Sequence, residues 1–246
     1  MGPAARGAEP DRVGAAIAAA LGSSGESAEH IGATIASLVD KSLVRFDGER
    51  HSLLETIREF ALELLQETDE RADTRRRHFD VYFAVAQSAE TSAEGGYGRP
   101  QLLLRERENL RAALDWAVAA GEITAATQLM VMLENFWVST DPFEGARRFE
   151  ELLAHELPEG LRARALRCFA GSLWLSGDYE RSHRLNEESL ALFRSWGDDE
   201  GVGVLLHRIG ISTMHLGDHE EARRLLDESR RLLRRVGSVR GEAEAI

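Results

Sequence analysis

Apolar residues recur with the spacing of an α-helix over most of the chain from Asp11 onward. DRVGAAIAAALG and SAEHIGATIASLVDK predict two helices, with Asp11 and Ser27 in the positions of N-terminal caps. A third helix carries an apolar stripe formed by Leu54, Ile57, Ala61, Leu64 and Leu65. We expect this third helix to pack inward along its whole length.

Between the second and third predicted helices the pattern changes to that of a short β-hairpin. SLVRF and RHSLL have the composition of strands, and DGE between them supplies the turn. A helix, a small hairpin and a second helix resemble the outline of a winged helix, and winged helices often bind DNA. The resemblance therefore raises the question of whether this hairpin contacts a nucleic acid.

The second half of the chain contains an internal repeat. TSAEGGYGRP is the clearest linker, and beyond it paired helices are joined by short turns. GDYERSHRLNEESLALFRSWGDDEG begins at Gly177 and GDHEEARRLLDESRRLLRRVGSVRG begins at Gly217, an offset of 40 residues. Many residues of the first copy have the same residue type 40 positions later: Gly177, Asp178, Glu180, Arg184, Leu185, Glu188, Ser189, Leu192, Arg194, Gly197 and Gly201. Repeats of this length predict stacked helix pairs.

The repeat resembles the tetratricopeptide family, which has a small residue in each first helix, a Gly-Asp-aromatic turn, and a small residue in each second helix. The matching positions are Ala170, Gly177-Asp178-Tyr179 and Ser182, then Gly210, Gly217-Asp218-His219 and Ala222. The fold class we expect is all-α, with a truncated winged helix followed by a tetratricopeptide-like solenoid. The expected domains are a leader and winged helix over 1–70, connecting helices over 71–125 and repeats over 126–246.

Composition narrows the functional classes. The net charge is −12, which does not favour phosphate backbones or anionic membranes. No apolar run is long enough to span a membrane, and the N-terminus lacks a signal-peptide core. Cys168 is the only cysteine, which excludes an internal disulfide and fits a reducing compartment, so we expect a cytoplasmic protein with Cys168 buried as core filler.

The order of LVDKSLV, a hairpin, LLETIREFALELL, RERENLRAALDWAVAAGE and helical repeats resembles the large bacterial STAND-class transcriptional regulators of the LuxR and SARP types. In that family an NB-ARC-like P-loop ATPase precedes the winged helix, and a helical-repeat sensor follows it. This chain has no GxxxxGK[ST] motif, and Leu53-Leu54-Glu55 replaces the nucleotide-contacting Met-His-Asp segment. The resemblance therefore implies a sensing portion without its ATPase, and we expect no cofactor.

Direct DNA contact is disfavoured by the residues of the winged helix. The helix in the recognition position contains no Arg, Asn or Gln, which are the usual readers of base edges, and it carries Glu29 and Asp40. In the hairpin, Asp47 and Glu49 offset Arg45 and Arg50. We interpret the hairpin as a structural joint. A stand-alone winged-helix DNA-binding regulator stays as the alternative function.

Signals for catalysis or metal binding are weak. His215 and His219 have metal-ligand spacing, but the Gly-Asp turn between them breaks the shared helix face. The arginines of 223–235 alternate with acids and indicate a solvated helix face. Trp116, Trp137 and Trp196 lie in apolar patterns that predict core positions. No catalytic constellation is present in the sequence, so we expect a non-enzymatic protein without a metal site.

Function is expected on the inner surface of the repeats, which the tetratricopeptide resemblance assigns to one face of each first helix. The predicted partner-binding residues are Arg164, Arg167, Trp174, His207, Met214 and His215. Such a surface can hold a protein or peptide segment, or alternatively a small-molecule inducer. Self-association through the last repeat is a further alternative, because that repeat shows no polar cap. The competing interpretation is that Trp174 and Met214 only pack between helices.

Overall fold

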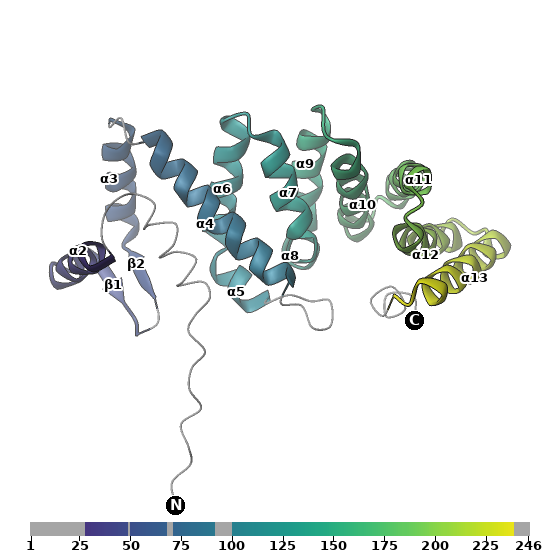
Figure 1. Cartoon of the computed structure of the whole chain (residues 1–246), viewed down its shortest axis with the longest axis horizontal. Helices are drawn as coiled ribbons and strands as arrows, with labels where there is room; N and C mark the ends of the chain where they lie inside the picture. Colours follow the sequence, from purple (N-terminus) through teal and green to yellow (C-terminus); the bar gives the residue numbers. More distant parts are fainter. Residues whose placement is uncertain (1–27, 49, 68–70, 92–99, 239–246) are drawn as a thin grey trace, which may run out of the picture. The chain divides into compact units, whose positions relative to one another are not determined.

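A computed structural model describes residues 28–48, 50–67, 71–91 and 100–238 of the chain (Figure 1). The predicted leader, the predicted helix over 11–22, both predicted caps and most of the predicted linker lie outside the described residues. The chain divides into two compact units, 1–85 and 86–246, and each is described by itself. The predicted boundaries at 70/71 and 125/126 stay predictions.

The first unit contains α2 (Ala28–Asp40), β1 (Val44–Phe46), β2 (His51–Leu53), α3 (Glu55–Gln66) and the beginning of α4 (Arg71–Thr91). The predicted hairpin is confirmed: the strands pair antiparallel with Val44 opposite Leu53. Asp47 closes the turn by accepting a hydrogen bond from the Arg50 backbone N–H at 2.8 Å, and Gly48 adopts a φ of 99°. A left-handed φ at this point favours glycine, so the sequence itself specifies the turn.

The predicted packing of α3 is wrong within the described structure. Leu54, Ile57 and Leu65 are half-buried, but Ala61 and Leu64 are exposed. The other described elements of the first unit contact α3 only sparsely, and they leave part of its apolar stripe uncovered. Periodicity reports which face of a helix is apolar and does not report whether a neighbour is there.

The second unit is built from consecutive helices that pack pairwise, as Figure 1 shows from teal to yellow. Their bounds are α5 (Pro100–Arg105), α6 (Arg107–Ala119), α7 (Ile123–Met132), α8 (Glu134–Thr140), α9 (Pro142–Leu153), α10 (Glu159–Ser176), α11 (Tyr179–Trp196), α12 (Asp199–His215) and α13 (His219–Val236). Together with the hairpin, these helices confirm the predicted all-α fold with a helical-repeat solenoid. None of the described helices is long and apolar enough to cross a membrane.

The repeat recurs in atomic detail. The Ser189 hydroxyl donates to the Ala163 carbonyl at 2.8 Å, and the Ser229 hydroxyl donates to the Gly203 carbonyl at 2.6 Å. Both bonds join the second helix of a pair to the first, and both serines are buried. A buried hydroxyl that donates to a helix carbonyl fixes the axial register of the two helices, because either group would be costly without a partner.

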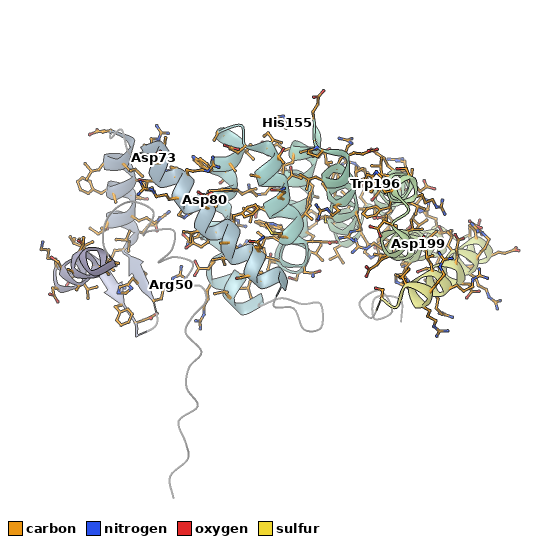
Figure 2. The ribbon with its side chains drawn as sticks, viewed as in Figure 1. Arg50, Asp73, Asp80, His155, Trp196 and Asp199 are labelled. Carbon is orange, nitrogen blue, oxygen red and sulfur yellow. The ribbon has the colours of Figure 1, made fainter. Side chains whose placement is uncertain are left out.

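Tryptophan burial follows the prediction in part. Trp137 is fully buried and Trp116 is half-buried, but Trp196 at the end of α11 is 41% exposed (Figure 2). Trp196 lies one residue before Gly197, which ends the helix with a φ of 71°. At a helix terminus the apolar stripe no longer faces a neighbour along its full width, and the ring of Trp196 makes an edge contact with Phe193.

The α12–α13 contact depends on the absence of side chains. A Cβ at Gly203 would lie 2.7 Å from Leu233, which is itself 1% exposed, and a Cβ at Gly210 would lie 2.9 Å from Leu226. Both distances are shorter than real Cβ contacts allow, so the two helices approach because glycine stands at these positions.

We predict that Gly203→Ala lowers the free energy of unfolding by about 1–3 kcal/mol, because the added methyl group must displace a buried leucine. Gly160→Ala is the matched control, since a Cβ there meets nothing within 4 Å. The control should be neutral or slightly stabilising, as alanine favours the helix by up to about 1 kcal/mol. Denaturant unfolding of both variants checks this, and equal stabilities would contradict the close approach.

Candidate functional site

A buried carboxylate joins three helices of the repeat region. Glu134 on α8 is 7% exposed and accepts a hydrogen bond at 2.9 Å from Arg208 on α12. Arg167 on α10 donates to its second carboxylate oxygen at 3.3 Å. Arg208 also donates to the Arg167 backbone carbonyl at 3.2 Å. One carboxylate therefore ties together helices from successive pairs.

The two arginines determine the charge state of Glu134. Burial alone would raise the pKa of its carboxyl, but the nearby charges of Arg208 and Arg167 outweigh burial and hold the pKa at about 2. Glu134 is thus ionised at neutral pH. Because Arg167 is engaged with Glu134, this predicted partner-binding residue also has a structural role.

Two further residues complete this buried region. Cys168 is fully buried, as predicted, and burial together with the charge of Glu134 raises the pKa of its thiol. A Cβ at Gly171 would lie 3.4 Å from an Arg208 nitrogen and 3.6 Å from a Glu134 oxygen. A Cβ at Gly171 would therefore lie in ordinary contact with this ion pair, which places the α10 backbone directly beside it.

Three aromatic rings meet where α10, α11 and α12 end or begin. The ring centroids of Trp174 and Tyr179 are 4.6 Å apart, and those of Trp174 and His215 are 4.8 Å apart at an interplanar angle of 82°. Tyr179 and His215 stack with centroids 5.4 Å apart. Two predicted binding residues, Trp174 and His215, are thus brought together, and Tyr179 joins them although sequence reasoning did not select it for the site.

The predicted binding residues not yet described lie on α10 and α12. Arg164 on α10 is exposed, His207 on α12 is half-buried, and Met214 on α12 is 43% exposed. Arg164 and Met214 are therefore accessible to a partner. Whether the six predicted residues bind one stays a prediction.

A second ionic network connects α6 with α9. Arg111 pairs with Glu144, and Arg148 donates to Glu144 at 2.8 Å and to Asp115 at 2.7 Å. Burial would raise the pKa of Glu144, but its hydrogen bonds to Arg111 and Arg148 lower it. The guanidinium of Arg148 also lies 5.7 Å from the Trp137 ring centroid. Ion pairs therefore connect α6 and α9, the helices before the clear repeats.

The histidine pair considered for a metal is divided as expected. His215 is the last residue of α12 and His219 is the first residue of α13, with Gly217 at a φ of 97° between them. Within the described ranges no group of three His, Cys, Asp or Glu side chains is placed to hold a metal ion.

Comparison with known proteins supports the repeat assignment. Residues 161–235 match the tetratricopeptide repeat family model. The chain is 36% identical over 194 residues to proteins from Mycobacterium bovis and from two strains of Mycobacterium tuberculosis, which are named as candidate HTH-type transcriptional regulators. The alignment covers 72% of this chain and 22% of each relative, so the chain spans about a fifth of their length.

We predict that Glu134→Gln lowers the free energy of unfolding by about 3–5 kcal/mol at neutral pH, because the two arginines lose a buried counter-charge. Glu150→Gln is the control: Glu150 pairs with Arg181 at a solvent-exposed position, where an ion pair is worth at most about 1 kcal/mol. Denaturant unfolding compares the two variants, and equal losses would contradict the importance of burial.

Acid should remove the same stabilisation from the wild-type protein. The folded-state pKa of Glu134 lies below its ordinary value of 4.5, so its contribution is complete above pH 4.5 and is lost as the pH falls toward about 2. The difference in unfolding free energy between wild type and Glu134→Gln should therefore stay constant from about pH 7 to about pH 4.5 and shrink between about pH 4.5 and about pH 2. A difference that stays constant over the lower range as well would show that the charge of Glu134 is not responsible.

Proposed function

We propose that this chain is a non-catalytic protein-interaction and sensing module of a STAND-type transcriptional regulator. The observation that carries the proposal is the tetratricopeptide match over residues 161–235, because such repeats commonly present a surface to a protein or peptide segment. The names of the mycobacterial relatives support a role in transcription. The partner is held on the inner surface, by Arg164, Arg167, Trp174, His207, Met214 and His215.

Sensing requires that binding changes a contact elsewhere in the regulator. In the proposed arrangement the winged helix over 1–70 and the connecting helices over 71–125 relay the occupancy of the repeats to a neighbouring ATPase domain. A ligand shifts such an equilibrium only through unequal affinity for the two states. The buried Glu134 network supports this proposal, since it makes α8, α10 and α12 respond together to a partner bound on any one of them.

The alternative function is a stand-alone winged-helix regulator that binds DNA through the hairpin. The α2–β1–β2–α3 order and the HTH designation of the relatives favour it. A mobility-shift assay at low salt with promoter fragments from the source genome separates the two functions. Under the main proposal the chain gives no sequence-dependent shift, because a chain of net charge −12 is repelled by phosphates. A shift that survives competitor DNA would favour the alternative.

We predict that Arg164→Glu lowers the affinity of the chain for its protein partner by at least about tenfold, or about 1.4 kcal/mol, as measured by fluorescence anisotropy. The partner is first recovered in a two-hybrid screen of the source genome with the chain as bait. Arg223→Glu, an equally exposed position on α13, is the matched control and should leave the affinity unchanged. Binding that is unchanged by Arg164→Glu but abolished by Arg223→Glu would place the interaction on the second helix of each pair instead.

A further inference from the structure

Large apolar side chains remain exposed around the ring cluster formed by Trp174, Tyr179 and His215. Tyr179 is 40% exposed and Met214 43%, while Leu175 and Leu216 are each 51% exposed. The contact between the Tyr179 and His215 rings shows that the α10–α11 and α12–α13 turns lie next to each other. We call the exposed apolar residues of these two neighbouring turns, together with the ring cluster, the turn edge. Large exposed apolar side chains that gather on neighbouring turns are typical of a docking surface.

Carboxylates lie beside the turn edge on both turns. Asp178 and Glu180 flank Tyr179 in the first turn, and Asp218 and Glu220 occupy the equivalent positions in the second; all four are exposed. Asp178 and Asp218 each use one carboxylate oxygen to cap the following helix, at the backbone N–H groups of Arg181 and Glu221. Among the described residues, none of these four carboxylates is in an ion pair.

Two nearby guanidinium groups, those of Arg181 and Arg224, are held by other residues. Arg181 pairs with Glu150 and lies 5.0 Å from the Phe169 ring centroid. Arg224 pairs with Glu221 and Glu228. The turn edge is apolar and aromatic at its centre and carries four exposed carboxylates at its rim.

We propose that the turn edge binds a segment of a partner protein in which arginine or lysine stands beside an apolar side chain. A guanidinium stacks on aromatic rings and pairs with carboxylates, and the partly exposed Tyr179 beside Asp178 and Glu180 offers both. The apolar side chain packs against Leu175, Met214 and Leu216. Acidic segments and nucleic acids are repelled by the same carboxylates.

This inference rests on the proposed function, because Trp174, Met214 and His215 belong to the inner surface, and it adds the chemistry of the partner. Arg164 and Arg167 on that surface would by themselves favour an acidic partner. Arg167, however, is engaged with Glu134, which leaves the carboxylates of the turn edge to dominate at this end of α10 and α12.

The test uses the whole chain and three fluorescein-labelled peptides that place leucine beside arginine, citrulline or glutamate in a glycine–serine background. Anisotropy is measured at about 0.15 M salt, so that long-range attraction to the acidic chain is screened. We expect the arginine peptide to bind at least about tenfold more tightly than the citrulline and glutamate peptides. No binding of the arginine peptide, or equal binding of all three, would overturn the proposal.

Variants locate the binding. The double variant Glu180→Gln, Glu220→Gln should lower the affinity for the arginine peptide by at least about tenfold. The single variant Tyr179→Ala should lower it by as much, whereas Tyr179→Phe keeps the ring and therefore the affinity. Glu59→Gln with Glu63→Gln makes the same change of charge at exposed positions of α3 and should have no effect. Equal losses in the α3 variant, or no loss in the turn-edge variants, would assign the binding to general electrostatic attraction and reject the site.

The two proposals can fail separately. A partner whose affinity depends on Arg164 but is unchanged by the Tyr179 and Glu180 variants would retain the proposed function and reject the turn edge. An arginine peptide that depends on Tyr179 and Glu180, in a chain with no partner sensitive to Arg164, would retain the turn edge and reject the wider inner surface.

Discussion

The ion pairs of Glu134 with Arg167 and Arg208 constrain the relative placement of three helices in the repeat region. They connect residues 33 and 74 positions apart in sequence and come from three helices. Losing either arginine would leave a buried charge poorly compensated, so the ion pairs favour one relative placement of α8, α10 and α12. The concave side of a helical repeat is useful for recognition only when such placement is kept, since a partner contacts several first helices at once.

Around this ionic centre the helix pairs are joined by smaller contacts that recur with the repeat. The serine-to-carbonyl bonds of Ser189 and Ser229 set the register of each pair, and glycine at positions 203 and 210 sets the distance between α12 and α13. The serine bonds oppose sliding of one helix along the other, and the glycines allow the two helices to lie close together. Helix packing at native density tolerates little change in either.

The fold could be predicted because its evidence lies close together in the sequence. Identity at one fixed offset predicted the repeats, and the DGE turn predicted the hairpin. The Glu134 network could not be predicted in this way, because it breaks the repeat: the residue equivalent to Arg208 in the preceding copy is Cys168. An isolated glutamate in the apolar run MLENFW was the available signal, but nothing in the sequence identified the arginines that would reach it. Likewise, the stripe on α3 was visible in the sequence and the sparse surroundings of that helix were not.

The single thiol of the protein offers a direct view of motion in the repeats. Cys168 is completely enclosed, and its environment opposes formation of the thiolate that alkylating reagents require. Labelling can proceed only when α10 separates from its neighbours, so the rate of modification by a maleimide measures how often the solenoid opens. Cys168 is therefore an intrinsic probe of local unfolding, and because the sequence has no second cysteine, all of the labelling reports on this position.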